Sequence, residues 1–191
     1  MAPRLAQALD RVAAYPYTRK DYARRVLWGL VDKVLIRPSP RRAFGWRRFW
    51  LRQMGATLAD TARTWPTTRI VHPWLLEVGA HSAVAGGVNV YNLGRIRIGD
   101  HTVVSQDAHL CAGTHDYRRP ELPLIRAEIT IGSGVWVCAE AFVGPGVTVG
   151  DNAVVGARAV AGRDVPAWTV VAGNPAAVVK PRPRPAEPGA G

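Results

Sequence analysis

His115 opens a long interruption in an otherwise periodic part of this chain. Imidazole titrates near neutral pH, so a histidine in such a position can take a proton from a weak nucleophile such as a hydroxyl group. A general base of this kind needs a partner that orients its ring. The carboxylates nearby in sequence are Asp107, Asp116, Glu128 and Glu140, and each stays a candidate. A surface histidine without a chemical role is the simpler interpretation.

The chain on both sides of this interruption repeats every six residues, from residue 78 to residue 161. An aliphatic or small apolar residue opens each repeat, and glycine often follows it. These positions are Val78, Val84, Val90, Ile98, Val104, Leu110, Ile131, Val137, Val143, Val149, Val155 and Ala161. Two residues are extra between Val90 and Ile98, and 15 are extra between Leu110 and Ile131. The longer excess contains His115.

A period of six differs from the steps of three and four in an α-helix and from the step of two in an amphipathic strand. It indicates short strands separated by corners, with three strands in each coil and the aliphatic side chains stacked inside. We therefore predict an all-β chain that folds as a left-handed parallel β-helix, a triangular prism of three to four full coils. An antiparallel β-sandwich is disfavoured, because its turns recur every ~8–12 residues.

The N-terminal quarter of the chain is strongly basic. The net charge is +11, and residues 1–52 alone hold 13 Lys and Arg against 3 Asp. Apolar residues recur at helical spacing over 21–36, and a second short segment rich in Trp and Arg covers 44–51. We predict a basic helical arm over 1–54 and the β-helix over 55–180, with a functional loop at 114–130. Residues 181–191 are predicted to form a flexible Pro-rich tail.

The composition limits the class of protein and its compartment. Hydrophobic residues make up 48% of the chain, with 19 Gly and 15 Pro, which is typical of a folded domain rich in turns. The two cysteines, Cys111 and Cys138, are too few for a disulfide framework. No apolar run approaches the ~20 residues that span a bilayer, and no apolar signal segment follows Met1. We expect a cytoplasmic protein, with a peripheral position at the inner membrane as a further expectation.

Several segments together resemble the hexapeptide-repeat acyltransferases. The similarity is greatest to the maltose, galactoside and nodulation acetyltransferases, and among these to the O-acetyltransferases of colanic-acid and other exopolysaccharide biosynthesis. The segments are 37–40, 45–48, 91–93, 105–111, 114–117, 131–136, 155–157, 164–166 and 173–175. They extend over about residues 25–182. The resemblance in fold rests on the repeats. The resemblance to acetyltransferases in particular rests on the His115 loop and Trp136.

The resemblance implies that an acetyl group passes directly from acetyl-CoA to a sugar hydroxyl, in the biosynthesis of exopolysaccharide, capsule or a related glycan. It implies that His115 is the general base. It places Asn92, Asp116 and Tyr117 on the acceptor side of the site. Asn89 is an alternative to Asn92, because the two extra residues nearby make the alignment ambiguous there.

The resemblance also implies a set of residues that bind acetyl-CoA, and no metal. These residues are Trp136, Ala139, Ala157, Arg163 and Lys180. Trp136 would close an edge of the cofactor tunnel, and the backbone N–H of Ala139 would face the acetyl carbonyl. Arg163 and Lys180 would lie near the nucleotide phosphates. Where the family often has Thr-Lys, this chain has Gly162 before Arg163, so the charge is kept and the hydroxyl is lost.

The expected partners follow from the same resemblance and from the basic arm. The family places CoA between adjacent subunits, so we expect a homotrimer in which His115 faces a neighbour's Trp136 and Ala139. A basic amphipathic segment with Trp suits an anionic membrane surface, so we expect residues 1–52 to contact lipid. Packing of this segment on the solenoid is the alternative. The arm contains no recognised nucleic-acid-binding module, and we expect no nucleic acid.

Two other functions remain as alternatives. A zinc enzyme of the γ-type carbonic anhydrase class would need three converging histidines. His109 and His115 are six residues apart, but no third histidine has a matching phase nearby. A non-catalytic solenoid that acts as an assembly scaffold is the second alternative.

Overall fold

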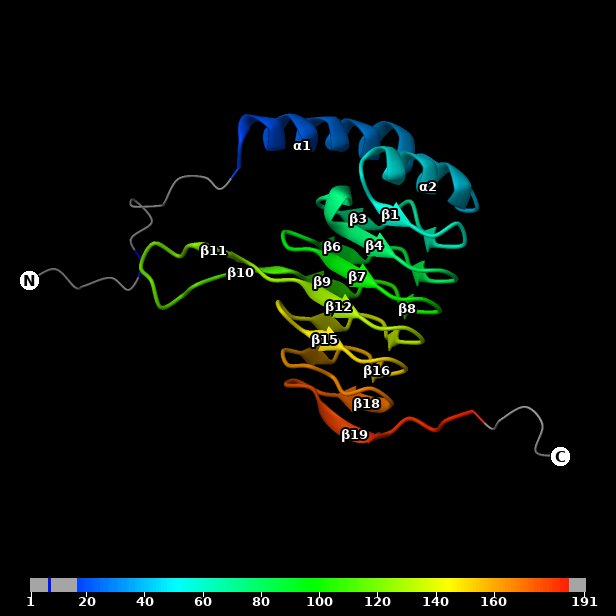
Figure 1. Ribbon diagram of the computed structural model, residues 1–191, viewed down its shortest axis with the longest axis vertical. Coiled ribbons are helices and arrows are strands. Elements are labelled where there is room, and N and C mark those ends of the chain that lie inside the picture. The colour runs from blue at the N-terminus through cyan, green and yellow to red at the C-terminus, as the bar shows by residue number, and fades with distance from the viewer. Residues whose placement is uncertain (1–6, 8–16, 186–191) are drawn as a thin grey trace, which may run out of the picture.

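The computed structural model of the chain is a parallel β-solenoid with a helical cap at one end (Figure 1). It describes residue 7 and residues 17–185. Residues 1–6 and 8–16 of the predicted arm, and residues 186–191 of the predicted tail, lie outside the described residues. The prediction of an all-β parallel β-helix with a helical N-terminal segment is confirmed.

Each coil of the solenoid contributes one short strand to each of three parallel sheets. Sheet A contains β1 (Thr57–Leu58), β4 (Leu76–Val78), β7 (Ile96–Ile98), β12 (Ile129–Ile131) and β15 (Thr148–Val149). Sheet B contains β2 (Arg63–Thr64), β5 (Ala83–Val84), β8 (Val103–Val104), β13 (Trp136–Val137), β16 (Val154–Val155) and β18 (Thr169–Ala172), with the antiparallel β19 (Ala177–Pro181) at its end. Sheet C contains β3 (Arg69–Ile70), β6 (Asn89–Tyr91), β9 (His109–Cys111), β14 (Phe142–Val143) and β17 (Val160–Ala161).

The solenoid has five complete coils and the start of a sixth, so the prediction of three to four coils is wrong. The coil that the sequence did not reveal is the first one, whose inward residues are Leu58, Thr64 and Ile70. Thr64 is buried but polar, which hid the aliphatic repeat at this point.

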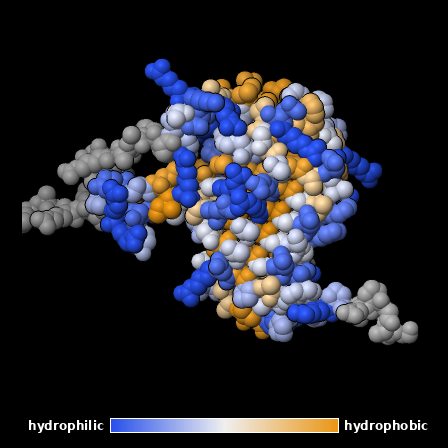
Figure 2. All heavy atoms as spheres, viewed as in Figure 1, coloured by the Kyte–Doolittle hydropathy of each residue, from blue (hydrophilic) through white to orange (hydrophobic). Residues whose placement is uncertain are grey.

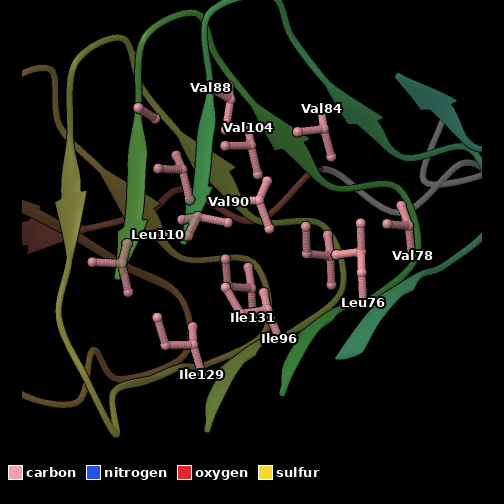
Figure 3. Close-up of a cluster of buried hydrophobic side chains, with 14 of the residues drawn as sticks. Leu76, Val78, Val84, Val88, Val90, Ile96, Val104, Leu110, Ile129 and Ile131 are labelled. Atoms are coloured by element: carbon pink, nitrogen blue, oxygen red, sulfur yellow. The ribbon is translucent and has the colours of Figure 1, made fainter. Parts of the chain in front are cut away.

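The core is a stack of the predicted inward residues, one layer for each coil. Figure 3 shows Val84, Val88, Val90, Val104 and Leu110 directed into the interior from successive coils. All five are fully buried. Neighbouring inward side chains lie one strand spacing apart, about 4.8 Å, so each aliphatic residue covers the next. The stack explains why a period of six was visible in the sequence.

The three corners of the prism differ in backbone conformation. Left-handed residues recur where sheet A meets sheet B and where sheet B meets sheet C, and each of these corners turns in very few residues. They are His81, His101, Gly134, Asn152 and Trp168 at the first corner, and Gly87, Asp107, Glu140 and Arg158 at the second. At the corner from sheet C to sheet A the described left-handed residues are Gly146, between β14 and β15, and Leu122, in the interruption. Extra residues enter the chain at this third corner, including the helix η3 (Pro73–Leu75).

The predicted interruption forms an antiparallel hairpin at the third corner. Strands β10 (Gly113–His115) and β11 (Leu124–Arg126) pair with each other outside the three sheets. The hairpin projects from the side of the solenoid between β9 and β12 (Figure 1).

The helical cap consists of α1 (Arg19–Val31), η2 (Asp32–Ile36) and α2 (Phe44–Gln53). Thr18 begins α1 with a capping box, since its hydroxyl accepts from the Asp21 N–H and the Asp21 carboxylate accepts from the Thr18 N–H. Trp28 is buried on the first coil and donates its indole N–H to the carbonyl oxygen of Ile70 at 2.8 Å. The helices predicted over 21–36 and 44–51 are confirmed. None of the described helices is long and apolar enough to cross a membrane.

Arg47 joins the cap to the first coil. Its side chain is fully buried and donates to the carbonyl oxygens of Thr64, Pro40 and Arg41 at 2.7–2.8 Å, and to the hydroxyl of Ser39 at 3.0 Å. Burial lowers the pKa of Arg47 below its usual range. The carbonyl dipoles solvate the guanidinium in place of water.

Candidate active site

His115 ends strand β10, and its imidazole is exposed on the projecting hairpin. The Nδ1 atom lies 2.6 Å from the carbonyl oxygen of Leu122. A carbonyl oxygen can only accept, so Nδ1 carries the proton in this bond, and Nε2 of the neutral ring keeps a lone pair. The hairpin therefore presents a histidine whose outer nitrogen can accept a proton.

The four carboxylates near His115 in sequence have other partners or positions. Asp116 accepts from the guanidinium of Arg118 at 2.9 Å, and this contact lowers the pKa of the Asp116 carboxyl. Glu128 pairs with Arg97, and Glu140 pairs with Arg158. Asp107 lies in the turn before β9. No hydrogen bond joins any of the four to His115 among the described residues, so the backbone of Leu122 orients the ring.

Tyr117, also predicted on the acceptor side, is on the same hairpin as His115. Its side chain is 84% exposed. Asp116 and Tyr117 are therefore next to His115 in space as well as in sequence, on a part of the chain that other molecules can reach.

Asn92, predicted on the acceptor side, does not lie at an open site in this structure. Its side chain is fully buried at the corner after β6. Its Oδ1 accepts from the N–H groups of Val71 and His72 at 3.1 and 2.9 Å, and its Nδ2 donates to the His72 carbonyl at 2.6 Å. The amide is thus occupied in closing the corner one coil above.

Asn89, the alternative to Asn92, is on the outer face of sheet C. Its Nδ2 lies 3.3 Å from Nε2 of His109, one strand away. The ring of His109 packs edge-on against Tyr91 and Phe142. Burial lowers the pKa of His109, which favours its neutral form. These side chains form a half-buried polar and aromatic face that leads toward the hairpin corner.

Trp136 is on the outer face of sheet B and not in the core. Its ring is 50% exposed, and the indole N–H donates to Oγ of Ser105 at 2.9 Å. Trp136 pairs with Val154, Val154 with Val170, and Val170 with Lys180. With strands about 4.8 Å apart, the row from Trp136 to Lys180 covers roughly 14 Å. The row leads from an aromatic ring across apolar side chains to an ammonium group.

Ala139 and Ala157 follow β13 and β16 at the corner from sheet B to sheet C, one coil apart. The Ala139 carbonyl accepts from the N–H of Arg158 at 3.0 Å. Within the described residues, the N–H groups of Ala139 and Ala157 have no acceptor. Two backbone donors on a partly exposed corner are available to an external oxygen.

The predicted site residues fall into two groups on one chain. His115, Asp116, Tyr117 and Arg163 follow strands of sheet C, at the corner from sheet C to sheet A. Trp136, Ala139, Ala157 and Lys180 belong to sheet B and the corner from sheet B to sheet C. Sheet C separates the two corners. A single chain therefore does not unite the histidine with the predicted cofactor residues.

The histidines do not converge as a metal site would require. His81 and His101 stack with ring centroids 4.8 Å apart at the corner between sheets A and B, while His72 is buried under the cap. In the part of the chain that the structure describes, no three His, Cys, Asp or Glu residues group together in a way that could hold a metal ion.

Some residues of the site could not be found from residue types. The orienting group of His115 is a backbone carbonyl, which has no signature in the sequence. Ser105 lies 31 positions before Trp136, and only the stacking of β8 on β13 brings the two together.

Comparisons with known proteins agree with this architecture. A family model described as bacterial transferase hexapeptide (six repeats) matches residues 128–163. The putative colanic acid biosynthesis acetyltransferase WcaF of Escherichia coli is 40% identical over 156 residues, which cover 82% of this chain and 86% of WcaF. The crystal structure of a maltose O-acetyltransferase from Clostridium difficile superposes with a TM-score of 0.80 at 23% identity, over 89% of this chain and 92% of that one. The acetyltransferase VCA0836 of Vibrio cholerae, solved with acetyl coenzyme A, gives a TM-score of 0.79 at 25% identity, over 92% and 96% of the two chains.

Proposed function

The chain belongs to the hexapeptide-repeat acetyltransferases, and from this we propose that it moves an acetyl group from acetyl-CoA to a sugar hydroxyl in the biosynthesis of an exopolysaccharide or a related glycan. The observation that carries the chemistry is the hydrogen bond from Nδ1 of His115 to Leu122, which leaves Nε2 as a proton acceptor on an exposed hairpin. The relative WcaF, named for colanic acid biosynthesis, supports a glycan acceptor.

In the proposed reaction, Nε2 of His115 takes the hydroxyl proton as the acceptor oxygen forms a bond to the thioester carbon. The resulting oxyanion collapses, and the carbon–sulfur bond breaks. The CoA thiolate then recovers the proton from the imidazolium. The backbone N–H of Ala139, which has no acceptor among the described residues, supports the proposal of an oxyanion donor. No covalent enzyme intermediate is involved.

On the acceptor side, we propose Asn89 in place of the buried Asn92. Asn89 is half-buried on sheet C beside His109 and Tyr91, and it retains hydrogen-bonding capacity. Asp116 and Tyr117 would contact the acceptor from the hairpin. Polar and aromatic side chains of this kind are typical of sites that bind sugars through hydroxyl groups and ring faces.

On the acetyl-CoA side, we propose that the cofactor extends along sheet B. The exposed ring of Trp136 would flank the thioester end, and the N–H of Ala157 would bond the pantetheine arm. Lys180, about 14 Å from Trp136 along the row, would meet the phosphates. Arg163 would add a second positive charge from the other corner. Gly162 has open space around its Cα, so a side chain at that position would be accommodated.

We propose a homotrimer, because the two groups of site residues occupy different corners of one prism. In a cyclic trimer, one corner of each subunit can face the next subunit. The hairpin of one copy would then place His115 beside Trp136 and Ala139 of its neighbour. Each subunit pair would complete one site.

The function is tested by mass spectrometry of the extracellular polysaccharide from cells with and without the protein. We expect each acetylated repeat unit to lose the mass of one acetyl group when the protein is absent. His115→Ala should give the same loss, while Tyr117→Phe, which retains the ring, should retain most of the modification. Unchanged acetylation in the His115→Ala strain would refute the proposed base.

A further inference from the structure

The helical cap has a second apolar side that faces away from the solenoid. Trp28 and Val31 of α1 are buried on the first coil. Val26, Leu30 and Val34 recur at steps of four on another side of the same helical segment, and their side chains are 68%, 58% and 58% exposed. Nothing among the described residues covers them, so packing within one chain does not explain this stripe.

Other apolar side chains enlarge this surface. Tyr22 and Leu27 of α1 and Trp46 and Phe49 of α2 are also exposed. Figure 2 shows orange side chains along the outer side of the cap, at the top of the view, with blue side chains next to them. The described helices of the cap therefore expose several aliphatic and aromatic side chains.

The charge on the cap is predominantly positive. Residues 19–52 contain 11 Lys and Arg and only 2 Asp, and Arg37 pairs with one of these, Asp32. Arg41 and Arg42, in the loop between η2 and α2, have no ion-pair partner among the described residues. A surface that combines exposed aliphatic groups with excess positive charge suits a partner that is apolar inside and negatively charged at its surface.

We propose that the outer side of this cap is a docking surface for an anionic lipid bilayer. Val26, Leu30 and Val34 would enter the boundary between headgroups and acyl chains, and Trp46 would lie at the same level, where indole rings are favoured. The arginines beside the stripe would contact lipid phosphates. This proposal concerns the position of the enzyme and does not depend on the identity of its acceptor.

The cap is at one end of the solenoid, which determines how the bound protein stands on the membrane. In the trimer proposed above, three caps lie at the same height along the threefold axis, so three weak contacts act together. The solenoid then points away from the bilayer. The hairpin leaves the prism after the third coil, which is two strand spacings, or roughly 10 Å, from the first coil.

The hairpin also touches the cap. The guanidinium of Arg126 in β11 lies 4.9 Å from the ring centroid of Tyr17, the residue just before the α1 capping box. The guanidinium of Arg25 lies 4.6 Å from the same centroid. Because β11 pairs with the strand that carries His115, the docking surface and the base belong to connected parts of the chain. An acceptor attached to a membrane would reach the site from the side of the cap.

Vesicle sedimentation of the full chain tests the proposal. The probes are vesicles of phosphatidylcholine alone, and vesicles of equal parts phosphatidylcholine and phosphatidylglycerol. We expect binding to the anionic vesicles that weakens at least about tenfold when salt rises from ~0.05 to ~0.5 M. The triple substitution Val26→Gln, Leu30→Gln and Val34→Gln should weaken binding at least about tenfold.

Val178→Gln with Val179→Gln is the matched control. These two side chains are 57% and 63% exposed, and they lie on β19 at the opposite end of the solenoid. The control should bind vesicles as the unmodified chain does. Circular dichroism checks that each variant stays folded. Arg41→Gln with Arg42→Gln should weaken binding to the anionic vesicles only.

Three results would overturn the proposal. The first is no binding to anionic vesicles at low salt. The second is equal binding by the triple variant and the unmodified chain, which would leave charge alone as the cause. The third is a loss of concentration-dependent self-association in the triple variant, measured by sedimentation velocity, without any loss of vesicle binding. That result would assign the stripe to contacts between copies of this chain.

Discussion

The Nδ1 atom of His115 lies 2.6 Å from the carbonyl oxygen of Leu122, across the turn of one hairpin. Leu122 itself has a left-handed backbone, with φ of 47°. The orientation of the imidazole therefore depends on the backbone of a nearby turn and not on a carboxylate. Since a carbonyl cannot give up a proton, the bond selects the tautomer with a free Nε2.

Leu122→Gly should reduce the turnover number about threefold to tenfold and leave the KM for acetyl-CoA unchanged. Glycine makes the turn less rigid, so the Leu122 carbonyl is held less firmly beside Nδ1. Steady-state kinetics at saturating acceptor measure the effect. Leu122→Asn is the control, because asparagine tolerates the left-handed region. Full activity of the glycine variant would show that the bond has no influence on the base.

Mixed trimers of His115→Ala and Trp136→Ala chains should regain activity that neither variant has alone. If each site takes His115 from one chain and Trp136 from the next, every trimer that holds both kinds of chain has one intact site, or about a third of its sites. The two chains can be co-expressed with different tags, purified through both tags and assayed for acetyl transfer. Absence of any recovered activity in verified mixed trimers would place both residues in a site within one chain.

Ser105→Ala should raise the KM for acetyl-CoA about twofold to tenfold, with a smaller effect on the turnover number. The variant removes the hydroxyl that accepts from the indole N–H of Trp136 at 2.9 Å. The ring would then lose its defined orientation on sheet B. Binding isotherms and tryptophan fluorescence should change together. Ser105→Thr retains the hydroxyl and should behave like the unmodified chain, whereas an equal effect of both substitutions would contradict this explanation.

The stability of the protein should fall as the pH drops below about 6.5. Burial lowers the pKa of His72 and of His109 from the ordinary value of 6.5. The unfolded chain therefore binds protons at these side chains more readily than the folded chain does. Their contribution is fully present above the unfolded pKa and is lost as the pH falls toward the folded values.

Urea unfolding at about pH 7.5 and about pH 5.5 measures this difference. The double variant His72→Gln with His109→Gln should lose less stability between the two pH values than the unmodified chain. An equal loss in both proteins would assign the acid sensitivity to other groups.

Arg47→Met should destabilise the fold by about 2–4 kcal/mol. The substitution leaves the buried carbonyl oxygen of Thr64, the part-buried carbonyl oxygens of Pro40 and Arg41 and the Ser39 hydroxyl without the donors that Arg47 provides. The free energy of unfolding in urea gives the magnitude. Arg48→Met is the matched control, since Arg48 is only partly buried and donates to a single carbonyl, that of Ala62. Similar losses in both variants would mean that the buried contacts of Arg47 add little.

The sequence was sufficient to predict the fold because a solenoid repeats one local rule. Each inward aliphatic residue packs on a residue of the same type one coil away. The same structural position therefore appears in the sequence three times, as Val84, Val104 and Val137. The first coil was missed because Thr64 fills an inward position with a polar side chain. The hairpin was predicted as an interruption, but its strands were not, since few aliphatic residues alternate there.

The site was harder to predict, because its contacts join distant or featureless parts of the chain. Asn92 and Asn89 looked equivalent in the sequence, yet one is fully buried and the other is half-buried on an outer face. Asn89 lies on a strand and Asn92 lies three residues later, at the corner after that strand. The two extra residues nearby made it unclear from the sequence which of the two side chains faces outward. The predicted site residues are divided between two corners of the prism, and this division depends on the strand order, which the repeat alone does not show.

The third corner of the prism, from sheet C to sheet A, can accommodate inserted segments without disturbing the stacked coils. The other two corners have the same short length in every described coil, so an inserted residue would disturb the stacking above and below. The corner from sheet C to sheet A already accepts extra segments of very different length, from η3 to the β10–β11 hairpin. Mutation can lengthen or replace such a segment while sheet B keeps its row from Trp136 to Lys180. If the proposed sites are correct, a lineage built on this prism can exchange one acceptor for another while the proposed acetyl-CoA site on sheet B stays unchanged.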